Sequence, residues 1–491
     1  MTVISAWGLP KGWRKVKYKY EENGIVVESK STLPLLERVF KDERKVVVLP
    51  ITLADGKGDL KSAVLERVEE GLKDDSKALE AFKNSEKVII PGRGKFMSNN
   101  VLKEFEAPTE TIISSMVLKL FDLIDENVLL DITHGVNFYP VALRGTLEKL
   151  MRIKSLGKKS KMEVGSSDPF YPSKDTTDVT LSFRKLESLN ISTTLSELPE
   201  LVGEVRSLVK GSFEKKWKEV KVKLLRSFRG LKAGSPLYWS YLLVRLYKDT
   251  KLKGDVEELW DEVLKLIDKS YEVMGDKVLH KVTVYPEAAF ALAAYKSLYS
   301  FAKEFSKTEH FLLDKVFLVN FKSLEELEPH LSAVERSLWL IEKSKLGNAF
   351  QKDLEGIRLD AINTIREISS NLNEVRGRAK GKLKERLKEL SDDEINTYLE
   401  ELLDMMVKDK VVPYGVVESE DDLEEALLWW VAFRATMDKH KDEVARNFLA
   451  HAGAEKNVTL LRKSGDLKLV GYYIPAMNAL EDVLMNKLKA R

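Results

Sequence analysis

The segment that decides the fold lies between residues 128 and 137 and reads Val128-Leu129-Leu130-Asp131-Ile132-Thr133-His134-Gly135-Val136-Asn137. Its apolar first half has the length of one buried strand. Its polar second half contains a glycine, which lets the backbone come close to a ligand. In an open α/β sheet, ligands bind beyond the carboxyl ends of the strands. The segment therefore predicts such a sheet, with a binding site at one of its edges.

Similar apolar runs alternate with helical patterns through the first 190 residues. The runs lie at 3–7, 46–49 and 88–90, with shorter candidates at 162–164 and 179–181, and helical spacing covers 60–72, 111–124 and 142–153. Asn23-Gly24 suits a type I′ turn and predicts a β-hairpin between 16–20 and 25–28. We predict a Rossmann-like α/β domain with a mostly parallel sheet over residues 1–190.

Long helical patterns replace this alternation from about residue 195 onward. Helices are predicted at 195–229, 237–246, 256–267, 287–305, 324–341, 354–372, 391–407, 421–439 and 441–451. Two short apolar runs, 458–461 and 467–470, flank Ser464-Gly465-Asp466 and predict a small hairpin. We expect a largely all-α region, divided into a helical connecting region at 191–420 and a carboxyl-terminal region at 421–491.

The composition narrows the chemistry that the chain can perform. Its 491 residues include 80 Lys plus Arg, 78 Asp plus Glu, six His and no Cys, for a net charge of +2. Absence of Cys excludes disulfides, thiolate zinc sites and a cysteine nucleophile, and we predict no metal site. Since the net charge is near zero, any nucleic acid must meet a local basic surface.

The setting also follows from composition. Charged residues make up 32% of the chain and Gln occurs once, which resembles the usage of thermophile proteins. The amino terminus lacks an apolar signal region, and no stretch has the ~18 apolar residues of a membrane span. We expect a cytoplasmic protein.

Glycine-containing loops follow several of the predicted strands. They are Trp7-Gly8, Arg93-Gly94-Lys95, the loop at 133–137 and Gly165-Ser166-Ser167. On one edge of a sheet, their small, hydroxyl and cationic groups would suit a polar or phosphorylated ligand. The alternative is that loops between strands and helices contain Gly and Ser for turn geometry alone.

A second candidate site lies at Arg446-Asn447-Phe448-Leu449-Ala450-His451. Gly453 suits the C′ position of a helix, which places His451 in the last turn. Asn447 and His451 are four residues apart and share a helix face, and the long Arg446 side chain can reach the same point. A titrating imidazole, an amide and a fixed cation suit metal-free RNA cleavage by the 2′-hydroxyl. The alternative is an ion-pairing surface Arg and a half-buried His.

Two basic segments could contribute to such a site. They cover 215–232 and 376–388, and both alternate cations with other residues. A solvated face that forms salt bridges is the simpler interpretation. The functional interpretation is a track for RNA phosphates.

Taken together, three short segments resemble the CRISPR-associated CARF–HEPN ribonucleases, the ancillary nucleases of type III systems. Ile4-Ser5-Ala6-Trp7-Gly8 with Leu9-Pro10 is similar to the first strand and loop of that family. The segment 131–137 is similar to the strand-and-loop signature of its CARF sensor domain. The segment 446–451 matches the HEPN pattern of Arg, a polar residue and then His near the carboxyl end.

The resemblance implies specific roles. CARF domains of the family bind cyclic oligoadenylate across a dimer two-fold axis, and paired HEPN domains cut single-stranded RNA with an Arg and a His from each protomer. It implies catalytic roles for Arg446 and His451, with Asn447 as an orienting group. It implies activator contacts for Trp7, Gly8, Thr133, His134, Gly135 and Asn137. Arg93, Gly94 and Lys95 are added because they follow a strand on the same predicted edge.

The sequence thus predicts a homodimeric, metal-independent endoribonuclease with a HEPN region at 421–491. Cyclic oligoadenylate, most simply the tetra-adenylate, would switch it on in antiviral defence, and cleavage would leave a 2′,3′-cyclic phosphate. The main alternative is a ligand-sensing regulator whose helical half binds DNA without chemistry. A further alternative, degradation of the activator by the sensor domain itself, would use Thr133 and His134 but lacks a clear base.

Overall fold

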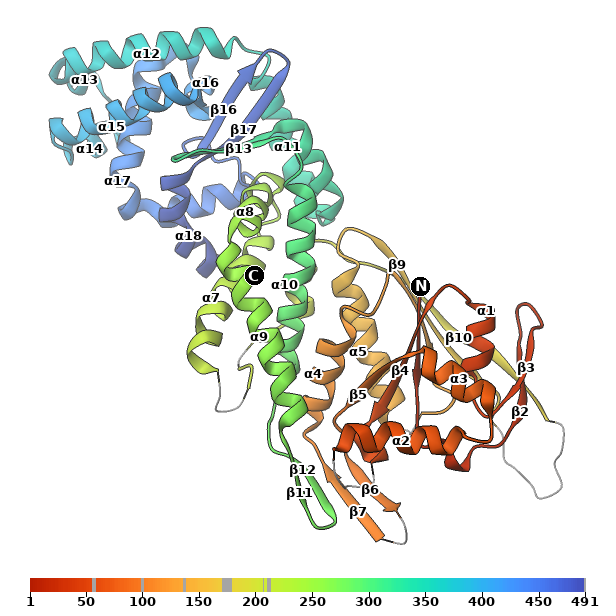
Figure 1. The fold of residues 1–491 in the computed structure, drawn as a ribbon. Coiled ribbons are helices and arrows are strands. Elements are labelled where there is room, and N and C mark those ends of the chain that lie inside the picture. Colours follow the sequence, from red (N-terminus) through yellow and green to blue (C-terminus); the bar gives the residue numbers. More distant parts are fainter. Residues whose placement is uncertain are drawn as a thin grey trace. The chain divides into compact units, whose positions relative to one another are not determined.

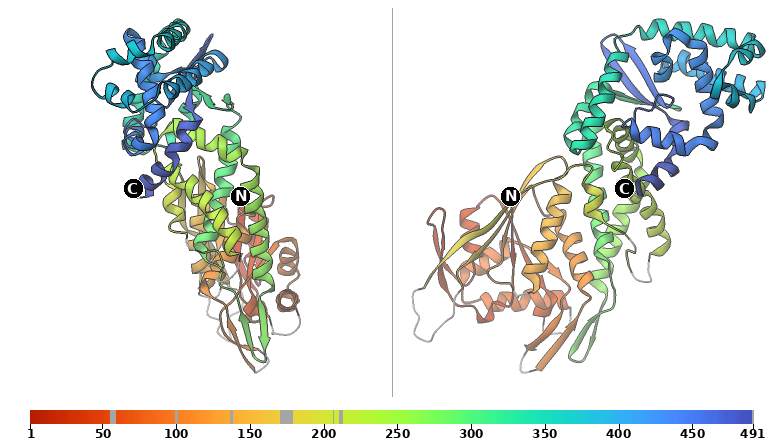
Figure 2. Two further views of the ribbon diagram at one scale, coloured as in Figure 1. Left: turned by 90° about the vertical axis from the view of Figure 1, so that its left-hand side faces the viewer. Right: turned by 180° about the vertical axis from the view of Figure 1, so that it is seen from behind.

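The computed structural model describes residues 1–54, 59–98, 101–135, 138–169, 179–205, 207–209 and 213–489. The chain divides into two compact units (Figures 1 and 2). The first unit contains 1–193, 200–224 and 250–298, and the second contains 194–199, 225–249 and 299–491. Residues 200–224 and 250–298 thus group with the amino-terminal residues, and 421–491 with 299–420, while the domain boundaries at 190 and 420 stay a prediction. The predicted fold class is confirmed.

An eight-stranded sheet dominates the described part of the first unit, in the order β3-β2-β10-β9-β8-β1-β4-β5. The strands are β1 (Thr2–Ala6), β2 (Val16–Tyr20), β3 (Val26–Ser29), β4 (Arg44–Pro50), β5 (Glu86–Ile90), β8 (Asn127–Asp131), β9 (Lys159–Ser167) and β10 (Thr180–Ser192). Strands β9, β8, β1, β4 and β5 run parallel, with Ile4 of β1 paired to Val46 and Leu130. Strands β2 and β3 form the predicted hairpin, and Gly24 in its turn has a φ of +71°.

Helices cover this sheet and bury its apolar residues. The first unit contains α1 (Leu33–Val39), α2 (Leu60–Leu72), α3 (Ser76–Asn84), α4 (Thr109–Leu120), α5 (Phe138–Lys154) and α9 (Thr250–Lys269), with 3₁₀ turns η1 (Pro10–Gly12) and η2 (Ile51–Leu53). Figure 1 shows α4 and α5 together on one side of the sheet and α1, α2 and α3 grouped on the other. Trp7, Val47, Leu49 and Phe82 pack in one core cluster between the sheet and the second group.

A second, smaller sheet in the first unit is a feature that the sequence did not predict. It has the order β11-β12-β7-β6, with β6 (Gly94–Ser98), β7 (Val101–Glu106), β11 (Tyr271–Met274) and β12 (Lys277–His280). Strands β6 and β7 form a hairpin at the place where a simple loop after β5 was expected. Strand β12 pairs with β7, so a segment of the helical half completes the sheet.

The described part of the second unit combines helices with an antiparallel sheet in the order β13-β14-β17-β16-β15. Its strands are β13 (His310–Leu312), β14 (Val316–Asn320), β15 (Val412–Pro413), β16 (Thr459–Ser464) and β17 (Leu467–Tyr473). Strands β16 and β17 are the predicted hairpin. Gly471 of β17 is required there, because a Cβ atom would lie 1.7 Å from the carbonyl oxygen of Phe317.

The helices of the second unit are α6 (Leu198–Val202), α8 (Pro236–Lys248), η3 (Phe321–His330), α11 (Ala333–Ala349), α12 (Leu354–Ser370), α13 (Leu372–Arg378), α14 (Gly381–Lys388), α15 (Asp392–Asp404), the π-helical turn η4 (Met405–Asp409), α16 (Tyr414–Glu418), η5 (Glu420–Asp422), α17 (Leu423–Ala450) and α18 (Ile474–Lys489). The boundary between the units falls within α6, α7 (Glu214–Leu231) and α10 (Pro286–Phe305), so that only Leu198 and Pro199 of α6 belong to the second unit. Among the described residues, no helix is long and apolar enough to cross a membrane.

Some helix boundaries differ from the predicted ones for local reasons. The helix predicted at 324–341 is divided at Ser332, whose side chain forms a capping box with Glu335 and starts α11. The helix predicted at 195–229 is replaced by α6 and α7. The helices predicted at 421–439 and 441–451 are one continuous helix, α17, since no Gly or Pro interrupts Lys439-His440-Lys441.

Candidate functional site

The first candidate site lies where the strand order of the large sheet reverses. Strand β1 has β8 on one side and β4 on the other, so the loops after β1 and β8 diverge and leave a crevice. A cavity of about 380 Å³ occupies this point, and we call it the switch-point cavity. Its lining residues are Gly12, Trp13, Arg14, Val16, Tyr18, Lys30, Thr133, His134, Ser166, Ser167, Asp168, Pro169 and Leu181.

A buried carboxylate holds the backbone of Thr133, one of the residues that line this cavity. Asp131, the last residue of β8, is 1% exposed. Its Oδ2 accepts hydrogen bonds from the hydroxyls of Thr32, at 2.5 Å, and Ser5, at 3.2 Å, and its Oδ1 accepts the backbone N–H of Thr133 at 2.9 Å. These bonds fix the start of the loop that carries His134.

The His134 ring is held on several sides. Its Nε2 accepts the backbone N–H of Thr32 at 3.2 Å, which assigns the proton of the neutral ring to Nδ1, and the Tyr18 hydroxyl lies 3.4 Å from the same Nε2. Trp13 stacks on the imidazole with the ring centroids 4.1 Å apart. Burial lowers the pKa of His134 from 6.5 to about 4, although the Asp131 carboxylate opposes the shift. The ring is therefore neutral at physiological pH.

The predicted activator residues after β1 and β8 fall into three groups. Thr133 and His134 line the cavity. Trp7, Gly8 and Gly135 instead support it: Trp7 is buried against Trp13 and Phe82, the N–H of Gly8 donates to the carbonyl of His134 at 2.8 Å, and a Cβ atom on Gly135 would lie 2.1 Å from Pro140 of α5. Asn137 lies outside the described residues.

Arg93, Gly94 and Lys95 do not line the switch-point cavity. They line a separate cavity of about 620 Å³ with residues of β7 and β12, and Lys95 forms an ion pair with Glu104 at 3.0 Å. The reason is the strand order: β5 is three strands away from β8, roughly 14 Å at the usual strand spacing. The predicted grouping of these three residues with the loop at 133–137 is therefore corrected.

The sequence pointed to Ser166 and Ser167 through the pattern of strand ends, and both line the switch-point cavity at the carboxyl end of β9. It did not single out five other polar or aromatic residues of the lining, which are Trp13, Arg14, Tyr18, Lys30 and Asp168. Trp13, Arg14 and Lys30 come from the irregular segments around β2 and β3 and have no such signal. Together these side chains offer stacking, cationic and hydroxyl contacts, which suit nucleotides.

The second candidate site lies at the carboxyl end of α17. Arg446, Asn447 and His451 are all exposed there, while Phe448 between them is buried. His451 follows the last helical residue, and the N–H of Gly453 donates to the carbonyl of Phe448 at 2.8 Å, which is a Schellman closure. The left-handed C′ residue is Ala452, with a φ of +44°, rather than the predicted Gly453, which comes one residue later with a φ of +83°.

A buried carboxylate also holds the second histidine. His451 Nδ1 lies 3.2 Å from Oε1 of Glu342 on α11, and the Glu342 side chain is only 6% exposed while that of His451 is 47% exposed. Lys345 donates to the same Glu342 oxygen at 2.8 Å. This arrangement fixes the ring through Nδ1 and leaves Nε2 for other partners. Sequence reasoning missed Glu342, which is 109 residues before His451.

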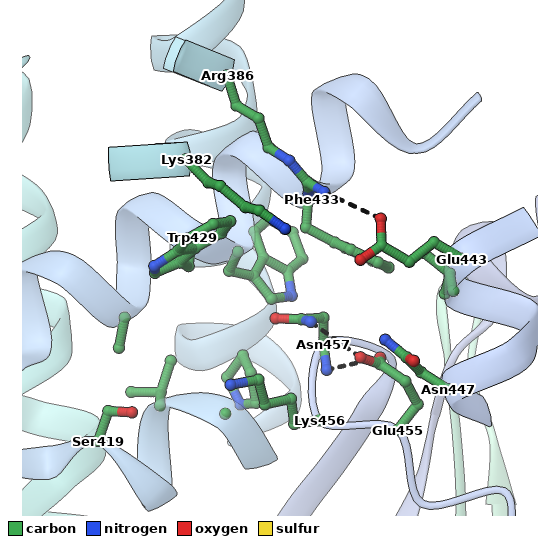
Figure 3. Close-up of a pocket in the computed structure, with 16 residues that line it drawn as sticks. Lys382, Arg386, Ser419, Trp429, Phe433, Glu443, Asn447, Glu455, Lys456 and Asn457 are labelled. Carbon is green, nitrogen blue, oxygen red and sulfur yellow. Dashed lines mark hydrogen bonds and ion pairs between the residues drawn. The ribbon is translucent and has the colours of Figure 1, made fainter. Parts of the chain in front are cut away.

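Asn447 also lines a cavity of about 200 Å³ inside the second unit, which we call the α17 cavity (Figure 3). Figure 3 shows Lys382 and Arg386 opposite Asn447, Glu455 and Asn457. Lys382 and Arg386 come from the basic segment 376–388. Arg386 pairs with Glu443 at 3.7 Å, and Arg376 of the same segment pairs with Asp392 and donates to the carbonyls of Leu387 and Leu390.

Comparison with known proteins supports the resemblance. Residues 2–169 match the family model of the CARF domain of the CRISPR system endoribonuclease Csx1. A relative from Methanocaldococcus jannaschii, named CRISPR system endoribonuclease Csx1, is 24% identical over 490 residues, which cover 95% of this chain and 89% of the relative. The matched residues include every residue that lines the switch-point cavity except Leu181. Residues 2–169 are therefore similar to a CARF domain, and the resemblance of the chain to the CARF-containing CRISPR-associated ribonucleases is confirmed.

Proposed function

We propose that this protein is a metal-independent endoribonuclease for single-stranded RNA, activated by cyclic oligoadenylate as part of CRISPR antiviral defence. The observation that carries the proposal is an exposed His451 fixed through Nδ1 by the buried Glu342, with Arg446 and Asn447 on the preceding helical turn. The name of the Methanocaldococcus relative and the CARF match support it.

The chemistry requires proton transfer at two oxygens. The 2′-hydroxyl of the substrate loses its proton as it attacks the adjacent phosphorus, and the 5′-oxygen leaving group gains a proton as its bond to phosphorus breaks. The products are a 2′,3′-cyclic phosphate and a 5′-hydroxyl. Nε2 of His451 suits one of these transfers, and Arg446 stabilises the charge on the phosphate oxygens. The second transfer suits His451 of a second protomer in the paired arrangement that the resemblance implies.

The switch-point cavity is the proposed activator site. Trp13 and Tyr18 provide aromatic surface for adenine, Arg14 provides a cation for phosphates, and the Ser166 and Ser167 hydroxyls provide further contacts. Lys30 also lines the cavity, but its ammonium pairs with Asp74 and donates to the Gly71 carbonyl at 3.0 Å. The neutral His134 presents no charge of its own to the ligand. Activation requires that the ligand binds the active arrangement more tightly than the inactive one.

The deciding experiment is cleavage of single-stranded RNA in EDTA, with and without cyclic oligoadenylates of different ring sizes. We expect cleavage only with activator, and a 2′,3′-cyclic phosphate end. His451→Ala is expected to lower kcat by about a hundredfold or more, as removal of a general acid–base does, and to leave folding and activator binding intact. His440→Ala is the matched control, since His440 lies on the same helix away from the proposed site.

Two results would contradict the proposal. Normal cleavage by His451→Ala would exclude the assigned site. Binding of duplex DNA without RNA cleavage would favour the regulator that the sequence left open.

A further inference from the structure

The α17 cavity contains a hydrogen-bond donor that has no partner. Trp430 lines the cavity and is 2% exposed. Its indole N–H is buried and makes no hydrogen bond with any described residue. A buried donor without a partner costs stability, so such a group suits an acceptor that a ligand brings.

The opposite side of the cavity presents amide groups in fixed positions. The Glu455 carboxylate, 4% exposed, accepts the backbone N–H of Asn457 at 2.8 Å, its side-chain N–H at 2.9 Å and the backbone N–H of Val458 at 3.1 Å. These bonds orient the Asn457 amide and leave its oxygen as an acceptor. Figure 3 shows Asn447 beside Glu455 and Asn457 at this side.

Aromatic and cationic side chains complete the lining. Trp429 and Phe433 join Trp430, and Trp430 in turn lies 5.7 Å from the Tyr473 ring, which supports it from behind. The Arg386 guanidinium lies 5.4 Å from the Trp429 ring centroid and 3.7 Å from Glu443. Lys382 and Lys456 add cations at the rim. Aromatic faces with a few fixed donors and acceptors and a cationic rim form a combination that suits a nucleobase and its flanking phosphates.

The position relative to the proposed cleavage site supports this occupant. Asn447 lines the cavity, and His451 is four residues further along the same helix face, a rise of about 6 Å. A nucleotide whose phosphate lies at Arg446 and His451 therefore has its base, or that of its neighbour, within reach of the cavity.

We propose that the α17 cavity is a base-selecting subsite, which binds one unpaired nucleobase of the RNA next to the cleaved bond and makes cleavage depend on that base. The subsite rests on the proposed RNase function. Selection follows because a base with an acceptor for Trp430 and a donor for Asn457 satisfies both groups, whereas a wrong base leaves the buried Trp430 N–H unpaired.

The test compares kcat/KM for four RNA oligonucleotides that differ only in the nucleotide beside the cut, with full-length protein and activator. We expect the unchanged protein to prefer one base by about tenfold or more. Trp430→Phe keeps an aromatic ring but removes the N–H, and is expected to bring the preference to within about threefold. Asn457→Ser is a second variant of the same subsite in case Trp430→Phe fails to fold.

Trp217→Phe is the matched control, because Trp217 is also buried with an unpartnered indole N–H among the described residues but lies outside the cavity. It should retain the base preference. Equal cleavage of all four oligonucleotides, or an unchanged preference in both cavity variants, would overturn the subsite.

A binding measurement separates this inference from the proposed function. Fluorescence anisotropy with the four labelled oligonucleotides and the His451→Ala protein reports base selection without cleavage. Selective binding that is lost when Trp430→Phe is added, together with no RNA cleavage by the unchanged protein, would support base recognition by the cavity and reject the RNase. Cleavage by the unchanged protein without any base-selective binding would support the RNase and reject the subsite.

Discussion

At the scale of single residues, the two histidines that the sequence singled out have opposite environments. His134 is enclosed by Trp13, Tyr18 and a backbone N–H, and its pKa is lowered to about 4 by burial. His451 is half exposed and contacts one buried carboxylate, Glu342, through Nδ1. The first environment suits a neutral group that shapes a cavity, and the second suits a group that exchanges protons with a substrate.

Glu342 is expected to act as a positioning residue for His451. Glu342→Leu removes the acceptor for the Nδ1 proton and should lower kcat for RNA cleavage by about a hundredfold, with KM changed little, because ring orientation matters for proton transfer. Glu342→Gln keeps a carbonyl acceptor and should lower kcat only about tenfold. Steady-state kinetics on the three proteins measures both constants.

The matched control for this series is Glu325→Gln. Glu325 of η3 pairs at 3.1 Å with Lys343, which lies on α11 as Glu342 does. The Glu325 side chain is 53% exposed, and exposed ion pairs contribute little to stability. Its kcat should stay within about twofold of the unchanged protein. Equal kcat values for the Leu and Gln variants at Glu342 would mean that the acceptor is not what positions the ring.

The lowered pKa of His134 predicts a pH dependence of stability. Because the folded-state pKa is about 4 and the ordinary value is 6.5, the unfolded chain takes up a proton between these pH values that the folded chain does not. This contribution to stability is complete above pH 6.5 and is lost as the pH falls toward 4.

Urea unfolding of the unchanged protein and of His134→Gln at pH 7.5 and pH 5.0 measures this effect. The unchanged protein should lose more unfolding free energy on acidification than the variant, whose side chain does not titrate. Equal losses would contradict the shifted pKa.

At this scale, the sequence predicted contacts between residues that are close together in the chain and missed contacts between residues that are far apart in it. Arg446, Asn447 and His451 are within six residues, so helical periodicity alone places them together. Glu342 reaches His451 only through the packing of α11 near the end of α17, and nothing in its own helix distinguishes it from other glutamates. Lys382 and Arg386 were noticed as members of a basic segment, but their place beside Asn447 depends on tertiary structure.

At the scale of elements, the end of α17 is fixed by a backbone that tolerates no side chain at Gly453. A Cβ atom there would lie 2.1 Å from the Ser235 hydroxyl and 2.9 Å from the Tyr472 hydroxyl, and the residue has a φ of +83°. Tyr472 also donates a hydrogen bond to the Gly453 carbonyl at 2.8 Å. These contacts determine where the helix stops and therefore where His451 points.

Gly453→Ala is accordingly expected to destabilise the second unit by about 3 kcal/mol, from left-handed strain and overpacking together, and to lower RNA cleavage because His451 is displaced. Gly465→Ala is the control. Gly465 has a similar φ of +60°, and a Cβ atom added to it would meet nothing within 4 Å, so the change should cost only about 1 kcal/mol of strain. Chemical denaturation measures both, and similar losses would mean that the packing at Gly453 is unimportant.

Strands were predicted correctly where their own residues form an apolar run. They were missed where they are defined by pairing with a strand far away in the sequence. Strands β1, β4, β5 and β8 were found because each is a compact apolar run. Strands β7 and β12 were missed because their pairing joins segments about 170 residues apart and each has little alternation of its own. Arg93 and Lys95 lie away from the loop at 133–137 for the same reason, since strand order across a sheet is not written in any one strand.

At the scale of the whole molecule, the number of proton-transferring side chains in one chain indicates how many chains the proposed reaction needs. The proposed reaction needs one group that removes a proton and one that delivers a proton. Each chain offers only one exposed histidine at the end of α17, together with one Arg446. Two chains with these helix ends facing each other would supply both groups by symmetry, whereas one chain would not.

This stoichiometry predicts a specific response to mixing. Protomers of the unchanged protein and of His451→Ala, unfolded together and refolded at equal amounts, should form homodimers and mixed dimers at random. If each cut requires both histidines, only the unchanged homodimers are active, and about one quarter of the full activity remains. If each chain acts alone, about half remains. Analytical ultracentrifugation checks that the mixture has twice the monomer mass, and a linear dependence of activity on the unchanged fraction would reject the composite site while leaving Glu342 and His451 in place as a single-chain pair.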